Sequence, residues 1–304
     1  MGRYIFKRVV IAILTMFVLA TITFFLVKIL PGNPFLNEKV PKEVQQRQRE
    51  YYGLDKPIFI QYLTYISKLV RGDLGTSLKF TGRKVTTIIS ETFPVSAVLG
   101  LAALIVSELT GTLFGILSAQ NKNKIPDYLL MIVAILGITL PSMVVGPLLR
   151  YAFSVKLRLL PLTGWGTLKQ AILPVFVMSL APLASSTRGM RASMLGVTTQ
   201  DYIKTARSKG LSPFKVVMRH QLKNSLIPVV TNLGPAVAVM IMGSFVVEQI
   251  FVIPGLGKHF VNAVTTLDYP MVMGLTIFYG AFLVTMTLLV DIVYGFIDPR
   301  IRLK

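Results

Sequence analysis

Long apolar stretches alternate with short polar segments along most of this 304-residue chain. A helix needs about 20 apolar residues to cross roughly 30 Å of hydrocarbon, where its backbone groups must be satisfied internally. Six stretches reach about this length, over residues 9–27, 95–119, 128–153, 171–187, 226–250 and 272–296. The pattern therefore predicts an all-α polytopic membrane protein with six transmembrane helices.

The first apolar stretch could be a cleaved signal peptide or a retained membrane helix. The first stretch follows Arg3, Lys7 and Arg8, as a signal peptide would. Its apolar run is longer than that of a usual signal, and no small-x-small cleavage site precedes Lys28, so we expect a retained helix.

Membrane helices tolerate prolines when neighbouring helices satisfy the freed carbonyls. The prolines that predict kinked spans are Pro141, Pro147, Pro174, Pro182 and Pro235.

A long polar segment over residues 31–93 separates the first two stretches. It predicts two short helices, one over 41–52 that ends at Gly53 and one over 57–71 that ends at Gly72. We expect the apolar face of the second helix to pack on the membrane bundle, with the membrane surface or a partner protein as alternatives. That face holds Ile58, Tyr62, Tyr65, Ile66 and Leu69.

The composition is typical of a membrane protein and argues against nucleic-acid binding, disulfides and a metal or cofactor site. Hydrophobic residues make up 53% of the chain and charged residues 15%, and the mean hydropathy is +0.65. A soluble domain carries roughly 25% charged residues. The net charge of +19 would suggest nucleic acid in a soluble protein, but no basic soluble domain stands out. Cysteine is absent and the two histidines lie in separate loops, so we expect no disulfide, metal or cofactor site.

The placement of basic residues sets the expected orientation. With the N-terminus in the cytoplasm, the inner segments hold sixteen Lys and Arg residues and the short outer loops hold five. This asymmetry follows the positive-inside rule. The other eleven lie between residues 28 and 84, in a segment long enough to be translocated regardless of charge. We expect both termini and residues 188–223 to be cytoplasmic, with residues 31–93 outside.

The loop over residues 188–223 is the most informative polar segment, with eight Lys and Arg residues against one acid. Residues 201–210 are typical of a helix that ends at Gly210, because glycine adopts the left-handed turn at a helix C-terminus without strain. Ser212 and Pro213 then begin a second helix, with serine at the N-cap and proline at the first helical position. Such a helix–glycine–helix elbow predicts a docking site for a partner that supplies energy.

The elbow resembles the cytoplasmic loop of the membrane subunits of type I ABC importers, whose motif is Glu-Ala-Ala, three residues and Gly. Here Lys204, Thr205 and Ala206 are followed after three residues by Gly210, so the spacing is kept and the acidic first residue is missing. The Leu-Pro end of the motif is also altered. Both departures are typical of the peptide and nickel permeases, and the residues that match this subgroup are Arg219, His220, Leu222, Leu226 and Pro228.

Further motifs of the same family are spread over the whole chain. They are Leu30-Pro31-Gly32-Asn33-Pro34, Gly72-Asp73-Leu74-Gly75-Thr76-Ser77, residues 248–257, Asp268-Tyr269-Pro270 and Asp298-Pro299-Arg300. The combination resembles the first, B-type membrane subunit of oligopeptide or dipeptide permeases. These motifs leave open whether the cargo is a peptide, a nickel chelate or glutathione.

The resemblance implies a type I ABC importer fold. Its parts would be an N-terminal helix over 1–30, an outer loop over 31–93, a permease core over 94–297 and a cytoplasmic tail over 298–304. The coupling elbow would occupy residues 199–223. In the family this elbow lies in a groove of the ATPase, where small residues permit close approach. The residues so assigned to ATPase coupling are Lys204, Thr205, Ala206, Arg207, Lys209 and Gly210.

The resemblance also implies the partners. They would be a second homologous permease subunit, two ATP-binding subunits that hold ATP and Mg, an extracytoplasmic binding protein and a peptide substrate, in the lipid of a bacterial or archaeal plasma membrane. The chain itself would be a transport subunit and not an enzyme. In agreement, the nearest approach to a phosphate loop, over residues 255–259, lacks the first glycine and the hydroxyl residue after lysine.

Four ionisable residues lie at or inside the ends of the expected spans, namely Glu108, Arg150, Glu248 and Asp291. Such residues face a bundle interior or a cavity. Glu248 would lie near the outer end of the fifth span, where it either lines the translocation path or holds the turn that follows. For Glu108 we expect a close helix contact, and for Asp291 a pairing with a loop arginine. A stand-alone secondary transporter is the alternative from another class, although no inverted repeat is visible.

Overall fold

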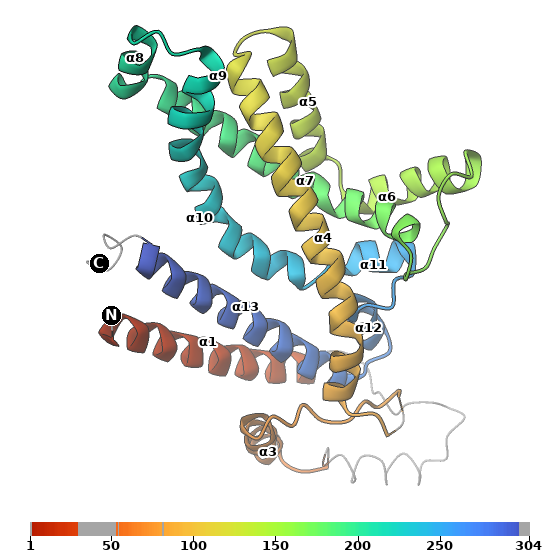
Figure 1. The fold of residues 1–304 in the computed structure, drawn as a ribbon. Coiled ribbons are helices and arrows are strands. Elements are labelled where there is room, and N and C mark those ends of the chain that lie inside the picture. The colour runs from red at the N-terminus through yellow and green to blue at the C-terminus, as the bar shows by residue number, and fades with distance from the viewer. Residues whose placement is uncertain (1, 30–52, 54, 81, 298–304) are drawn as a thin grey trace. The chain divides into compact units, whose positions relative to one another are not determined.

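The computed structural model describes residues 2–29, 53, 55–80 and 82–297, with side chains from residue 5 to residue 290 within these ranges (Figure 1). All regular elements of the described residues are helices. Five of these helices are long and apolar enough to cross a membrane, and a bent pair is a sixth candidate. The predicted all-α polytopic class is thus confirmed. The expected helix over 41–52 and the motifs at 30–34 and 298–300 lie outside the described residues.

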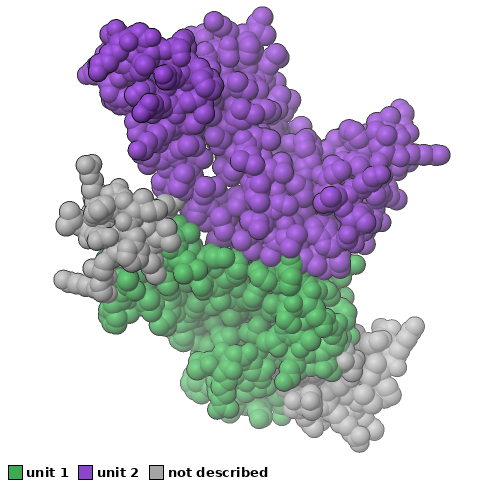
Figure 2. All heavy atoms as spheres, in the orientation of Figure 1, with its two compact units in different colours: residues 1–94, 255–304 green, residues 95–254 purple. Residues whose placement is uncertain are grey.

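The chain divides into two compact units, Met1–Pro94 with Gly255–Lys304 and Val95–Pro254 (Figure 2). In the first unit, α1 (Gly2–Ile29) and α13 (Tyr269–Ile297) lie side by side. They approach closely because Gly280 has no side chain. A Cβ at this position would lie 2.1 Å from Leu19 Cδ2.

Helix α3 (Ile58–Val70) packs on α1 through aromatic rings. The ring of Phe24 lies 5.4 Å from that of Tyr62 and 5.6 Å from that of Tyr65, measured between centroids. Gly72 follows the helix with φ +75°, as its predicted end requires. The apolar face of α3 therefore packs on the membrane-spanning helix α1, as predicted, although Ile58 at its start is exposed.

The second unit is built around α7 (Leu168–Thr198), which contacts α5 (Ile125–Thr139), α6 (Ser142–Arg150), α10 (Leu222–Ile241) and α11 (Phe245–Phe251). A capping box starts α7, because the Thr167 hydroxyl accepts a hydrogen bond from the Gln170 N–H. The helix stays continuous through its two internal prolines. It therefore runs as one element into the elbow.

Helix α4 (Val85–Gln120) crosses the division between the units, and its later part packs on α7. A Cβ at Gly111 would lie 2.8 Å from the Leu183 carbonyl oxygen, and one at Gly115 would lie 2.5 Å from Met190 Cβ. Small residues on α4 thus let the two backbones approach, as is common between membrane helices.

Two of the predicted spans have other boundaries in the structure. The stretch over 128–153 is not one helix: α5 ends before Pro141, and the following α6 with the π-helical turn η1 (Tyr151–Lys156) is bent from it by 104°. Proline disfavours a helical conformation in the residue before it, and Leu140 is extended with ψ 115°. The stretch over 226–250 is also interrupted, because Gly243 takes φ +80° after α10 and Ser244 caps α11.

Candidate functional site

The elbow predicted from the sequence is present as two short helices and a left-handed glycine. Helix α8 (Asp201–Ser208) ends at Gly210, which has φ +74°, and α9 (Pro213–Val216) begins after Ser212 at its N-cap. The Gly210 N–H donates to the Arg207 carbonyl at 2.9 Å, and the Leu211 N–H donates to the Ala206 carbonyl at 3.4 Å. This pair of bonds is a Schellman motif, which satisfies the last carbonyls of α8.

An apolar cluster joins the two arms of the elbow. Ile203 and Ala206 of α8 are buried against Val216 of α9, and Val197 and Leu211 pack around them. Ala206 is only 5% exposed, so it faces the inside of the elbow. The contact of Leu211 with this cluster is the hydrophobic contact that usually accompanies a Schellman motif. The elbow is therefore a small folded body with its own core.

The other residues assigned to coupling lie on the outer side of α8. Lys204, Thr205, Arg207 and Lys209 are all exposed. Lys204 pairs with Asp201 at 2.9 Å on the same helix, an exposed pair of the kind that contributes little to stability. The Thr205 hydroxyl donates back to the Asp201 carbonyl at 3.0 Å. The elbow thus presents a basic surface around a short helix.

Hydrogen bonds fix the elbow to its two long neighbours. Gln221, which is buried, belongs to the π-helical turn η2 (Val217–Gln221) and donates to the Thr198 hydroxyl of α7 at 3.1 Å. Asn224 of α10 donates to the Tyr202 hydroxyl of α8 at 2.7 Å. A displacement of α8 must therefore move the adjoining ends of α7 and α10.

A cavity of about 570 Å³ lies beside the elbow, between it and the ends of α4 and α7. Met194 and Leu195 contribute apolar walls, and Lys122 and Arg207 contribute charge. Phe214 of α9 also lines it and is 75% exposed. An exposed aromatic ring next to a basic, partly apolar hollow is a feature that interfaces use as an anchor.

Comparison with known proteins identifies the family of the chain. Residues 111–303 match the family model for the "binding-protein-dependent transport system inner membrane component". Residues 1–100 match the model for the N-terminal part of such membrane components. The chain belongs to this family. The permease is similar, at 42% identity over 304 residues, to the dipeptide transport system permease protein DppB of Bacillus subtilis (strain 168), with 100% of this chain and 99% of the relative covered.

Two more relatives carry similar names. The permease is 41% identical over 303 residues to the dipeptide transport system permease protein DppB of Lactococcus lactis subsp. cremoris (strain MG1363), with 100% of both chains covered. It is 41% identical over 305 residues to the oligopeptide transport system permease protein OppB of Escherichia coli (strain K12), with 99% of this chain and 100% of the relative covered. The resemblance to a type I ABC importer permease, seen first in the elbow and the motifs, is confirmed.

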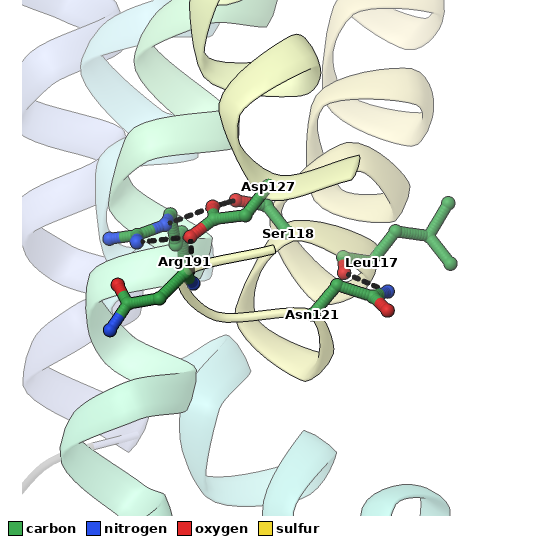
Figure 3. A network of polar contacts seen from close by, with 6 residues as sticks. Leu117, Ser118, Asn121, Asp127 and Arg191 are labelled. Atoms are coloured by element: carbon green, nitrogen blue, oxygen red, sulfur yellow. Dashed lines mark hydrogen bonds and ion pairs between the residues drawn. The ribbon is translucent and has the colours of Figure 1, made fainter. Parts of the chain in front are cut away.

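A buried polar network joins α4, α5 and α7 near the elbow (Figure 3). This network was not predicted from the sequence. Arg191 of α7 binds Asp127 of α5 with both carboxylate oxygens engaged, through Nε to Oδ1 and a terminal nitrogen to Oδ2, each at 2.7 Å. The Ser118 hydroxyl of α4 and the Asn123 N–H also donate to this carboxylate. From the sequence, Arg191 is one of eight basic residues in the loop over residues 188–223, and Asp127 is not singled out. One feature of the sequence could have indicated this pair. Asp127 lies in the first turn of an apolar helix, and an acid in such a position needs a polar or basic partner.

The four ionisable residues of the spans have different surroundings. Glu108 accepts a hydrogen bond from Ser186 of α7 at 2.8 Å, next to the close contact made by Gly111, as expected. Arg150 donates to the Ile250 carbonyl. Glu248 is fully buried, and its side-chain oxygen lies close to Gly243, before α11, and not at the turn that follows the helix. The side chain of Asp291 lies outside those described.

Two family motifs that are 190 residues apart meet in the first unit. The Asp268 carboxylate, which is buried, accepts a hydrogen bond from the Ser77 hydroxyl and another from the Leu78 N–H at 3.1 Å. The same carboxylate caps α13, through the Met271 N–H at 3.3 Å. The motif at 72–77 is thus fastened to the start of the last helix. This role could not be read from either motif alone.

Proposed function

We propose that this permease forms half of the translocation path of an ATP-driven importer of peptides. The named relatives are dipeptide and oligopeptide permeases, which favours a peptide cargo over a nickel chelate or glutathione. A second homologous membrane subunit supplies the other half of the path. Two ATP-binding subunits hold ATP and Mg and hydrolyse the nucleotide, and an extracytoplasmic binding protein delivers the peptide. Both termini are cytoplasmic, in agreement with the distribution of basic residues.

The elbow is the part that couples this chain to the ATPases. The observation that carries the proposal is a self-contained elbow with a basic outer face, hydrogen-bonded to two long helices. In this role Thr205, Arg207 and Lys209 contact the ATPase, and Lys204 does so after giving up Asp201. Ala206 supports the contact from inside by packing α8 on α9. Gly210 sets the angle between the two arms.

The experiment compares two glycines with open surroundings. A Cβ at Gly210 or at Gly196 would meet nothing within 4 Å, but only Gly210 has a positive φ. Gly210→Val places a β-branched residue in the left-handed region, which costs at least about 1–2 kcal/mol. Gly196→Val places the same side chain in a regular helix. We expect Gly210→Val to abolish peptide uptake or release the ATPases while the permease still inserts, and Gly196→Val to retain both functions.

The readouts are uptake of labelled peptide by intact cells and co-purification of ATP-binding subunits with the tagged permease. Normal uptake and an intact complex in the Gly210→Val variant would show that coupling does not depend on this turn. Co-purification also decides between an ABC importer and a secondary transporter, since the latter brings no ATPase.

A further inference from the structure

A second cavity, of about 460 Å³, lies in the first unit where α1 ends. It is bounded by α1, α3 and the first turn of α13, and the motif at 72–77 contributes part of its wall. Its size is in the range of small-ligand sites. All of its lining residues belong to one unit, and none of them takes part in the elbow.

The cavity carries an excess of positive charge. Lys28, Lys56 and Lys68 line it together with one acid, Asp73. The Asp73 carboxylate accepts a hydrogen bond from the Gly75 N–H at 2.9 Å. Among the residues that the structure describes, none of the three ammonium groups forms an ion pair. The charge of the described lining therefore favours an anion as the ligand.

The ammonium group of Lys28 is the most constrained of the three. It is partly buried, donates to the Gln61 side-chain oxygen and lies 5.6 Å from the centroid of the Phe24 ring. An ammonium has three donors and is poorly compensated by a neutral amide and a ring alone. An anionic oxygen placed in the cavity would supply the missing charge.

Tyr65 forms part of the wall of the same cavity. Its hydroxyl is buried and has no hydrogen-bond partner among the described residues. Burial, with a smaller effect of Tyr62, raises the pKa of Tyr65 to about 12, so the hydroxyl keeps its proton at physiological pH. The tyrosine ring stacks on Phe24, which fixes its position. A phosphate in the cavity would therefore be held by the lysines, since the buried Tyr65 hydroxyl is closed to an oxygen of the size of water.

The position of the cavity along α1 indicates where the anion comes from. The apolar span Ile5–Ile29 ends beside it, and Lys28 therefore lies at the level of the membrane interface. On the same last turn, Leu26 and Ile29 expose apolar side chains at 59% and 77%. We propose that the cavity binds the phosphate headgroup of an anionic phospholipid, whose acyl chains lie along the exposed face of α1. In the proposed orientation this headgroup belongs to the extracytoplasmic leaflet, and the three lysines attract it by their charge.

The experiment is native mass spectrometry of the detergent-solubilised complex that contains the permease. It is mixed with phosphatidylglycerol or phosphatidylcholine of identical acyl chains. We expect preferential retention of phosphatidylglycerol, and a loss of about fivefold in retention for Lys28→Gln and for Lys56→Gln. The matched control is Lys79→Gln, because Lys79 is an exposed lysine of the same unit that does not line the cavity.

Each other outcome overturns the proposal. Equal retention of the two lipids, or equal loss in Lys79→Gln and the cavity variants, would show that no specific headgroup site exists here. Binding of inorganic phosphate with the same lysine dependence, and without competition by phosphatidylglycerol, would assign the cavity to a soluble anion. Displacement of the lipid by peptides with a free carboxyl group, but not by amidated ones, would assign it to cargo.

Lys56 lies in the exposed turn before α3, so Lys56→Gln tests the site even if Lys28→Gln disturbs folding. The readout requires no ATPase activity. Failure of the lipid site is therefore distinguishable from failure of the proposed transport function.

Discussion

At the residue scale, Asp127 shows how one carboxylate can organise several segments. Its side chain is 3% exposed and engages α7 through Arg191, α4 through Ser118 and the turn between α4 and α5 through Asn123. Asn123 itself has φ +62°, a conformation that asparagine adopts more readily than most residues. The carboxylate thus fixes both the helix packing and the tight turn near the elbow.

Removal of this charge should destabilise the second unit. Asp127→Asn leaves the Arg191 guanidinium without its bidentate partner, and breaking such a pair costs about 3 kcal/mol. The double variant Asp127→Asn with Arg191→Gln should be more stable than the single one, because no uncompensated charge remains. Equilibrium unfolding of both variants in mixed micelles checks this. Equal stability of the single variant and the unmodified permease would contradict it.

His259 predicts a pH dependence at the same scale. Burial lowers the pKa of His259, Lys258 and Arg83 act in the same direction, and Glu91, which pairs with Arg83, opposes them. Because the folded permease then holds the neutral imidazole, its stability is full above the ordinary pKa of about 6.5. The stability is lost as the pH falls from there through the folded pKa, since the unfolded chain binds a proton first.

Unfolding measured between pH 5 and pH 8 tests this expectation. His259→Gln should flatten the pH dependence of the free energy of unfolding near pH 6. An identical slope in the unmodified permease and in His259→Gln would show that another group is responsible.

At the element scale, the close packing of α4 on α7 depends on glycine. A Cβ at Gly115 would lie 2.5 Å from Met190 Cβ and 2.7 Å from the Thr187 carbonyl oxygen, so the backbones would have to separate. Gly115→Ala should therefore lower stability by about 1–3 kcal/mol. Gly189→Ala on α7 is the control, because its Cβ would meet nothing within 4 Å. Similar melting temperatures of the two variants would refute the packing argument.

The elements also show which features a sequence can reveal. The elbow was predictable because its determinants, Gly210 and the Ser212-Pro213 pair, are local. The break of the third span at Pro141 was not, since Pro174 and Pro182 in α7 leave a continuous helix. The difference lies in whether neighbouring helices hold the chain straight, which is a tertiary property. The same limit applies to Asp127 and Arg191, whose pairing joins residues 64 apart.

At the scale of the whole molecule, the absence of cysteine makes the orientation testable. Ser67 on α3 and Ser208 on α8 are both exposed and can each be replaced by cysteine. An impermeant thiol reagent applied to intact cells should label position 67 and spare position 208, because the positive-inside rule predicts a cytoplasmic elbow. Labelling of position 208 alone would reverse the topology and remove the elbow from the ATPases.

The length and composition of α7 have a mechanical consequence. Its 31 residues span about 46 Å, against roughly 30 Å of hydrocarbon, so it is a continuous rod that projects beyond the membrane. Pro174 and Pro182 each remove one backbone hydrogen bond from the half that begins at Leu168. The half next to the elbow has no proline and is the stiffer one. If the elbow couples to the ATPases as proposed, we expect its displacement to move the adjoining half of α7 and to bend the half that contains the prolines.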